Sequence, residues 1–450
     1  MRNTNLWYNL KAAKRSLKEV PETLRLMLGA VTRTFGGAAD LPDVGSECPA
    51  PSRAYRPDST PVPIHVVTPS DGHYMTTFFD IDPLSPSGRY LAVTRVPFIW
   101  RVPTVGEAAS VVVIDLHTGH ARTVYRTVGW GAQLGANVQW GADDATLLCN
   151  DVIDGRGTGV RIDLRTLTAI PLSGPVYGLT PDRRTSFSAR IDYINAGIPG
   201  YGVPDPVFGK PRPSERQSKT DGIWRTDLET GASELFLSID DIVRQLPEQE
   251  SLAGGTYYVF NVKISPTGTQ GFAVLFSRGI PGRAGWPPQL VTFDLDGTNV
   301  RLAIPDRIWR RGGHHPSWLP WGDEIVMNLR HDSKKMQFVR FRPDGTDLNV
   351  LAPGHVGGGH PSLNQSGTHL LTDAYVSEKL ANDKGEVPIR LIDLRTNVET
   401  ALCHVDTKRL DGWRRIDPHP VWSDRGKKVF FNGIVDGRRQ VLCADMSNIS

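Results

Sequence analysis

Three histidines share one local setting and could form a metal site. His315, His360 and His419 each precede a proline, and each lies seven residues before a glycine-containing turn. Imidazole nitrogen is a frequent ligand of transition metals. A single such histidine is more often a hydrogen-bonded structural residue, but three in the same register favour a shared site. Asp417 lies two residues before His419, so both side chains point to the same side of an extended strand. We therefore expect these four residues to bind a divalent cation: Mn, Zn or Ca.

Two asparagines occupy the same register in other segments. Asn137 and Asn261 lie seven residues before turns at positions 144 and 268. A carboxamide donates and accepts hydrogen bonds, but it is not basic enough to remove a proton. Three histidines and two asparagines thus share one register, and we expect their side chains to lie close together at the axis.

Three further residues are candidates for catalysis. Tyr201 lies in a long insertion rich in proline and basic residues, a kind of segment that forms either a functional lid or a surface loop. Arg225 lies in the next expected strand, where it faces either solvent or the site. His73 precedes the first repeat and either lines one mouth of the site or is structural.

An internal repeat predicts the elements that position these residues. Short β-branched runs that end in Asp-Leu-x-Thr-Gly or a similar turn occur seven times, which is typical of a strand entering a hairpin. They are VVVIDLHTG (111–119), GVRIDLRTLT (159–168), GIWRTDLETG (222–231), QLVTFDLDGT (289–298), QFVRFRPDGT (337–346), IRLIDLRTNV (389–398) and QVLCADMSN (440–448).

A second signature precedes each of these strands. A strand breaks at a Ser-Pro-x-Gly turn or an equivalent, at positions 88, 144, 183, 268, 322, 367 and 426. A repeat of roughly 40–60 residues with four short strands indicates a β-propeller. We predict an all-β, seven-bladed propeller over residues 64–450, with an insertion at about 195–255. The strand near 64–68 would close the ring against the last blade.

The radial repeat predicts where the candidate residues meet. The residue seven places before each turn should start the innermost strand and face the central channel, and equivalent positions of all blades converge there. These residues are Ile81, Asn137, Val176, Asn261, His315, His360 and His419.

The composition excludes several classes of protein. The chain of 450 residues has 51 Lys and Arg against 48 Asp and Glu, a net charge of +3 that makes a polyanion-binding surface unexpected. Four widely spaced cysteines form neither a disulfide scaffold nor a zinc-binding Cys-x-x-Cys pair. The sequence has no Walker A, dinucleotide-binding GxGxxG, HExxH or GxSxG motif.

The first 63 residues differ from the repeats. Residues 1–35 interleave apolar and basic residues as in an amphipathic helix, which we expect to pack on its own domain or to touch a partner or a membrane surface. Residues 36–63 have the composition of a Pro-rich linker. There is no apolar run of membrane-spanning length and no signal-peptide pattern, so we expect a cytoplasmic protein.

These segments resemble the seven-bladed propeller polysaccharide lyases: the oligogalacturonate lyases and the related ulvan and rhamnose–glucuronate lyases. The resemblance covers about residues 64–448. Its most specific segments are HYMTTFFDIDPLSPSGRYLAV, GAQLGANVQWGADD, PGYGVPDPVF with DGIWRTDLETG, FNVKISPTG, HHPSWLPWG, GGHPSLNQSGTHLLTDAY and DPHPVWSDRG.

The resemblance implies roles for individual residues. His315 and His419 match metal ligands, Asp417 replaces a further histidine ligand, and Arg414 stands at the position of a glutamine ligand. Asn261 stands where the oligogalacturonate lyases carry the histidine that acts as base, and Asn137 stands where the ulvan-type relatives carry a histidine. Tyr201 matches the region of a catalytic tyrosine, and Arg225 matches an arginine of those relatives.

The activity implied is β-elimination on a uronic-acid-containing glycan, assisted by a metal. The base that takes the C5 proton would be His315, His360 or Tyr201, and Tyr201 could also be the acid that protonates the leaving O4. A cation or the amides of Asn137 and Asn261 would balance the carboxylate.

Two alternatives to this activity stay open. One is a glycoside hydrolase that uses His73 with Asp80 or Asp82. The other is a non-catalytic propeller that binds a glycan or a protein, with the asparagines marking an inactive site.

Overall fold

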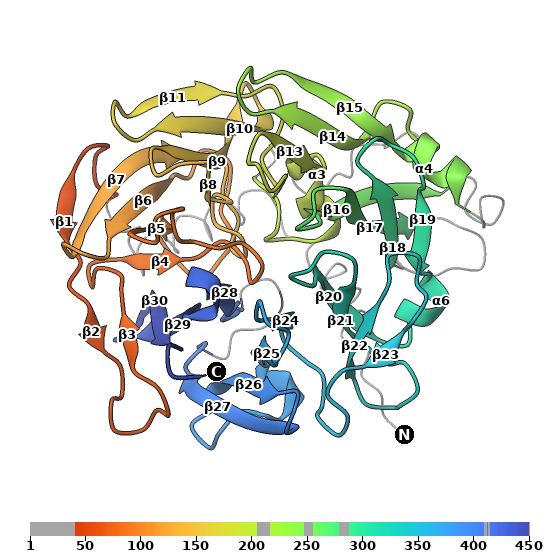
Figure 1. Ribbon diagram of the computed structural model, residues 1–450. Coiled ribbons are helices and arrows are strands. Elements are labelled where there is room, and N and C mark those ends of the chain that lie inside the picture. Colours follow the sequence, from red (N-terminus) through yellow and green to blue (C-terminus); the bar gives the residue numbers. More distant parts are fainter. Residues whose placement is uncertain are drawn as a thin grey trace, which may run out of the picture. The chain divides into compact units, whose positions relative to one another are not determined.

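The computed structural model describes residues 41–204, 217–246, 255–278, 288–408, 412 and 415–449. Within this part of the chain, seven antiparallel sheets surround a common centre, as Figure 1 shows. The predicted seven-bladed propeller is therefore confirmed. The amphipathic helix predicted over 1–35 and Arg414 lie outside the described residues.

The two sequence signatures correspond to fixed places in each blade. The Ser-Pro-x-Gly turns and their equivalents join the first strand of each blade to the second. The first, innermost strands are β4 (His73–Met75), β8 (Gln139–Trp140), β12 (Gly178–Leu179), β16 (Thr256–Ile264), β20 (Gly313–Trp318), β24 (Ser362–Leu363) and β28 (Val421–Ser423). The second strands are β5 (Tyr90–Val96), β9 (Thr146–Ile153), β13 (Thr185–Ser188), β17 (Gln270–Arg278), β21 (Ile325–Leu329), β25 (His369–Thr372) and β29 (Lys428–Val435).

All seven Asp-Leu-x-Thr-Gly segments are third strands. These are β6 (Ala109–Asp115), β10 (Arg156–Asp163), β14 (Gly222–Asp227), β18 (Pro288–Asp294), β22 (Gln337–Phe341), β26 (Val387–Asp393) and β30 (Arg438–Asp445). Six of them lead directly to an outer strand of the same sheet: β7 (His120–Thr127), β11 (Thr168–Pro171), β15 (Ser233–Ser238), β19 (Arg301–Ile304), β23 (Asn349–Val350) and β27 (Val398–Val405).

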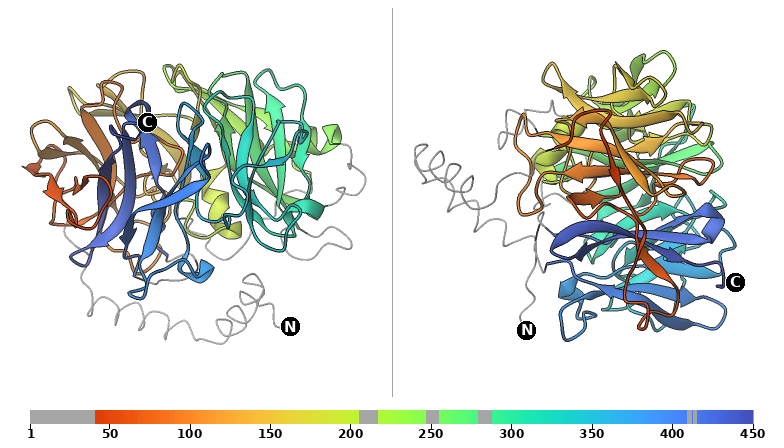
Figure 2. Two further views of the ribbon diagram at one scale, coloured as in Figure 1. Left: turned by 60° about the horizontal axis from the view of Figure 1, so that its bottom comes forward. Right: turned by 90° about the vertical axis from the view of Figure 1, so that its left-hand side faces the viewer.

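The N-terminal strands complete the seventh blade. Strand β3 (Ile64–Val66) pairs antiparallel with β30, and β2 (Arg53–Ala54) pairs with β3. Figure 2 shows these red strands beside the blue C-terminal ones. The predicted closing strand is confirmed. The segment 36–63 is not only a linker, because β2 extends blade 7 and β1 (Glu47–Pro49) pairs with β7 at the edge of blade 1.

The predicted insertion at about 195–255 is interrupted by β14 and β15, which belong to blade 3. One insertion joins β13 to β14 and contains α3 (Ile191–Gly197). Another joins blades 3 and 4 and begins with α4 (Ile239–Gln245), whose Ser238 and Asp241 form a capping box. Further short elements are α6 (Asp306–Trp309), η2 (Val376–Glu378) and η4 (Asp424–Gly426). Among the described residues, no helix has the length and apolar character required to cross a membrane.

The core consists of layers between neighbouring blades. Each sheet buries both faces, so its strands carry apolar residues on both sides. Between blades 1 and 2, for example, Val111 and Val113 share a cluster with Leu147, Cys149 and Ile162. Every cysteine is free, in agreement with the absence of a disulfide scaffold.

Blade 1 departs from the common plan at its innermost strand. Strand β4 ends at Met75, which pairs with Thr94, and pairing resumes only at Leu84. Thr76, and not Ile81 as predicted, takes the axial position: Asn432 accepts its backbone N–H just as Asn150 accepts that of Val176. Ile81 lies in the intervening loop, buried in a cluster with Phe78 and Phe79. The extra residues of this loop lengthen the segment between the axial position and the turn at residue 88. The fixed offset of seven residues used in the sequence analysis therefore gives the wrong residue in blade 1.

Candidate active site at the propeller axis

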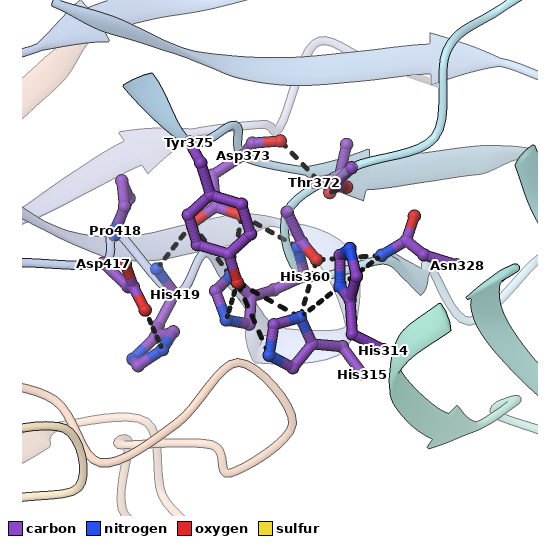
Figure 3. A network of polar contacts seen from close by, with 12 residues as sticks. His314, His315, Asn328, His360, Thr372, Asp373, Tyr375, Asp417, Pro418 and His419 are labelled. Atoms are coloured by element: carbon purple, nitrogen blue, oxygen red, sulfur yellow. Dashed lines mark hydrogen bonds and ion pairs between the residues drawn. The ribbon is translucent and has the colours of Figure 1, made fainter. Parts of the chain in front are cut away.

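The three predicted histidines meet at the axis. The ring centroids of His315 and His360 are 3.9 Å apart, and those of His360 and His419 are 4.3 Å apart. They come from blades 5, 6 and 7 and lie together in Figure 3. Phe78 packs edge-on against His419 at 4.7 Å, and Phe79 lies 5.2 Å from His360. The aromatic loop of blade 1 thus forms an apolar wall beside the imidazoles.

A left-handed backbone turns several axial residues toward the centre. The φ angles are 52° at Asn137, 54° at Asn261, 56° at His315 and 48° at His419. Asparagine and histidine are enriched among non-glycine residues with positive φ. Such a conformation costs on the order of 1 kcal/mol or more and persists only where the surrounding structure imposes it. The innermost strands β16 and β20 accommodate it with register shifts at these positions.

Asp373 orients two of the histidines. Its carboxylate accepts the backbone N–H of His360 at 2.8 Å, the His360 Nδ1–H at 2.8 Å and the backbone N–H of His419 at 3.1 Å. Asp373 is completely buried. Gly359 allows this approach, since its φ is +62° and an added Cβ would lie 2.2 Å from Asp373 oxygens. With Nδ1 of His360 engaged, its Nε2 faces the site.

His315 presents its Nε2 to the site in the same way. Its Nδ1 lies 2.9 Å from the Gly359 carbonyl and 2.8 Å from Nδ1 of His314. Since the carbonyl can only accept, Nδ1 of His315 carries the hydrogen and Nε2 holds the lone pair. Asn328 donates to both the Gly359 carbonyl and His314 Nδ1. Burial, followed by the neighbouring His360 and His314, holds the pKa of His315 well below its usual range, which keeps the ring neutral.

A second network joins Asp417, Arg415 and Tyr201. Nε of Arg415 donates to both oxygens of Asp417, at 2.9 and 2.8 Å, and Nη2 donates to the Tyr201 hydroxyl at 2.9 Å. Tyr201 is held in a tight turn by Asn195, whose side chain bonds three backbone groups of residues 200–203. Burial raises the pKa of Tyr201 to about 12 although Arg415 opposes the increase.

His360, Asp417 and His419 could hold a metal ion. One ligand atom from each lies within 4.8 Å of the others, and all three residues are buried. Both ring nitrogens of His419 are buried without a hydrogen-bond partner among the described residues. Burial and the nearby His360 hold the pKa of His419 well below its usual range, so the neutral ring can act as a ligand. The donor set therefore fits a divalent cation.

The two asparagines at predicted axial positions bind protein groups. Nδ2 of Asn137 donates to the Val176 carbonyl at 2.5 Å, whereas its Oδ1 is buried without a partner among the described residues. Oδ1 of Asn261 accepts from the Tyr177 hydroxyl at 3.3 Å. Both amides thus connect neighbouring blades.

Two candidates do not join the site. Arg225 lies on the outer half of blade 3, where its exposed guanidinium pairs with Glu234. Arg225 is on β14, the third strand of its blade, and Glu234 lies opposite it on the outer strand β15. His73 accepts the backbone N–H of Arg439 at 3.1 Å, and burial lowers its pKa to about 4.

The carboxylates proposed to assist His73 are also engaged elsewhere. Asp80 pairs with Lys263 at 2.7 Å, and Asp82 accepts from Ser423 at 2.6 Å. None of the described contacts links His73 to either carboxylate.

Sequence analysis missed three residues of the site: Asp373, Tyr375 and Arg415. Asp373 lies six positions after the turn at 367, and polar residues at this offset recur in other blades, which is a detectable signal. The Tyr375 hydroxyl lies 3.5 Å from Nε2 of His360 and of His315. The Arg415 guanidinium lies 5.2 Å from the Tyr375 ring centroid. Nothing local in the sequence distinguishes Tyr375 or Arg415.

Comparison with known proteins identifies the fold. No family model and no curated protein matches the sequence. Among solved structures, an oligogalacturonate lyase in complex with manganese is similar at 18% identity and a TM-score of 0.63, over 90% of this chain and 98% of that one. The oligogalacturonate lyase of Vibrio parahaemolyticus is similar at 15% identity and a TM-score of 0.61, over 90% and 99%.

The chain has the fold of these lyases. At such low identity the similarity extends to the fold alone. The motif-based resemblance is therefore confirmed at the level of architecture, and the seven-bladed scaffold is shared over nearly the whole of both lyase chains.

Proposed function

We propose that this protein is a lyase that cleaves a uronate-containing glycan by β-elimination at the axial histidine cluster. The main support is that imidazoles from blades 5, 6 and 7 converge beside Asp417 in a fold shared with oligogalacturonate lyases. One of those structures is a manganese complex. A uronate substrate and a divalent cation are thus the first ligands to test.

His360, Asp417 and His419 would hold the cation. When bound there, it would neutralise the substrate carboxylate and make the adjacent C5 proton more acidic. Asp373 contributes by fixing the ring of His360 and the backbone of His419. Carboxylates that orient ligating imidazoles in this way typically raise metal affinity.

His315 is the best-placed base. Its Nδ1–H is directed to the Gly359 carbonyl, so the lone pair of Nε2 is available to accept the C5 proton. The residue is half-buried, and the neutral ring needs no prior loss of a proton. In this role His315 is not a metal ligand, in contrast to the sequence-based prediction.

Tyr201 is the best-placed acid. Its oxygen accepts a hydrogen bond from Arg415, which leaves its own hydrogen free for the leaving O4. The same guanidinium would stabilise the phenolate that remains after proton transfer. Arg415 is half-buried and has five N–H donors, so it can also bind the anionic substrate.

Ultraviolet absorbance of the new C4=C5 double bond tests the proposal. The protein would be incubated with oligogalacturonate, ulvan or a glucuronate-capped arabinogalactan, with Mn²⁺ or with a chelator. We expect an absorbance increase that the chelator abolishes. His419→Ala should remove it, whereas the exposed His331→Ala serves as a matched control.

Other results would favour the alternative functions. New reducing ends without the ultraviolet absorbance of a C4=C5 double bond would indicate a hydrolase and not a lyase. Saturable binding of a glycan without either product would identify a binding module.

A further inference from the structure

We infer that the phenol oxygen of Tyr375 is an additional ligand of the cation, beside His360, Asp417 and His419. This inference rests on the proposed function, because it concerns the same site, but it adds a ligand from a residue outside every sequence-based prediction. With Tyr375 included, all four proposed ligands would come from blades 6 and 7. Figure 3 shows the phenol directed into the histidine cluster.

The distance from the phenol oxygen to Nε2 of His360 is that between two metal ligands rather than that of a hydrogen bond. The oxygen lies 3.5 Å from Nε2 of His360, 3.5 Å from Nε2 of His315 and 3.4 Å from Nδ1 of His315. An ordinary hydrogen bond of this kind spans about 2.6–3.2 Å. Two ligands at about 2.0–2.1 Å from a tetrahedral metal are about 3.3–3.4 Å apart. The Tyr375–His360 spacing therefore matches an edge of a coordination shell.

The donor set is complete when Tyr375 is included. His360, Asp417 and His419 provide three ligand atoms within 4.8 Å of one another. The phenol oxygen, 3.5 Å from Nε2 of His360, would be the fourth. A carboxylate and a phenolate would together balance the two charges of a divalent cation. Within the described ranges, the hydrogen-bond contacts of the hydroxyl are those with the imidazoles of His315 and His360.

The fold holds Tyr375 in place independently of any ligand. Its backbone N–H donates to the Glu378 carboxylate at 2.9 Å, and the Glu378 N–H returns a bond to the Tyr375 carbonyl at 3.0 Å. This pair frames the short helix η2 that follows β25. On the other side, the Arg415 guanidinium lies 5.2 Å from the ring centroid. Its positive charge would stabilise the phenolate form of Tyr375. The ring is therefore positioned before a cation arrives.

Ferric iron is a suitable probe, because phenolate bound to Fe³⁺ gives a charge-transfer band in visible light. The full-length protein would be loaded with ferric nitrilotriacetate, desalted and analysed for bound iron and for absorbance. We expect a band in the wild type that is lost in Tyr375→Phe at unchanged iron content. Tyr201→Phe is the matched control and should keep the band. By calorimetry, Tyr375→Phe should weaken Mn²⁺ binding roughly tenfold or more.

Three results would overturn the inference. They are a band that persists in Tyr375→Phe, bound iron without a band in the wild type, and unchanged Mn²⁺ affinity in Tyr375→Phe. None of these readouts needs a substrate. A phenolate band together with the absence of unsaturated products would support the ligand role of Tyr375 and reject the lyase, so the two failures are distinguishable.

Discussion

At the scale of single residues, one backbone position carries different chemistry around the ring. The axial residues in blade order are Thr76, Asn137, Val176, Asn261, His315, His360 and His419. The imidazoles are confined to blades 5, 6 and 7, whereas blades 2 and 4 present amides that bind protein groups. The reactive groups are therefore gathered on one side of the axis, where Tyr201 and Arg415 also arrive.

His315→Gln separates the role of base from that of ligand. Glutamine can donate to the Gly359 carbonyl but cannot accept a proton, so we expect kcat to fall by about 10²–10⁴ while Mn²⁺ affinity stays within about threefold. Initial rates and calorimetry check this, with His331→Gln as the control for an exposed histidine. Loss of Mn²⁺ binding would instead assign His315 to the metal, as the sequence predicts.

Asp373→Asn tests how the carboxylate supports its histidines. An amide cannot accept the three hydrogen bonds that Asp373 receives from His360 and His419. We expect Mn²⁺ affinity to fall by about 10–100-fold, with a smaller loss of thermal stability. Calorimetry and circular dichroism melts provide the two readouts, with the exposed Asp332→Asn as the control. An unchanged affinity would show that Asp373 is only structural.

At the scale of elements, polar side chains on the second strands connect neighbouring blades. Five turns are followed six positions later by a polar residue whose side chain bonds the backbone of the next blade near its axial position. The pairs are Thr94 with Ala136, Asn150 with Val176, Asn328 with Gly359, Asp373 with His419 and Asn432 with Thr76. The corresponding residues of blades 3 and 4, Ala189 and Val274, are apolar. These contacts tie the innermost segments of blades 1, 2, 3, 6 and 7 to the preceding blade.

Asn150→Ala should be strongly destabilising. Asn150 accepts from the Val176 N–H and donates to its carbonyl, both at 2.8 Å, and it is buried. Removing its side chain leaves the buried N–H of Val176 without a hydrogen-bond partner, which costs about 1–3 kcal/mol. Urea unfolding measures the loss, with the exposed Asn349→Ala as the matched control. Equal stabilities of the two variants would contradict a role in joining the blades.

At the scale of the whole propeller, strands from near the beginning and the end of the described chain close the ring. Besides the pairing of β3 with β30, Arg56 forms a two-pronged ion pair with Glu386, at 2.5 and 3.0 Å, which joins the loop after β2 to blade 6. Because Arg56 donates to it, the pKa of the buried Glu386 falls to about 2. The charged pair therefore stabilises the closed ring at neutral pH.

Glu386→Gln tests whether the stability contributed by the Arg56–Glu386 ion pair depends on pH. The pKa of Glu386 is lower in the folded state than in the unfolded one, so its stabilisation is present above about pH 4.5 and is lost as the pH falls through 2. We expect the variant to lose about 1–2 kcal/mol at pH 7 and nothing near pH 2. Urea unfolding across this range checks it, with the exposed Asp383→Asn in the same loop as control. A difference that did not change with pH would contradict the ion-pair explanation.

The sequence by itself determined the seven blades, the closing strand near Ile64 and the convergence of His315, His360 and His419. These follow from local rules, because turns and strand alternation repeat with the chain and a radial fold brings equal registers together.

Only the tertiary structure decided which partners complete the site. Asp373 reaches His419, Tyr375 reaches His315 and Arg415 reaches Tyr201 through contacts between blades. The loop after Met75 places Thr76, and not Ile81, at the axial position, next to the last residue of β4 that pairs with the second strand. Arg225 matched a motif yet lies on the outer half of blade 3. Such contacts join residues far apart in the chain, so they depend on how the blades dock and not on any local pattern.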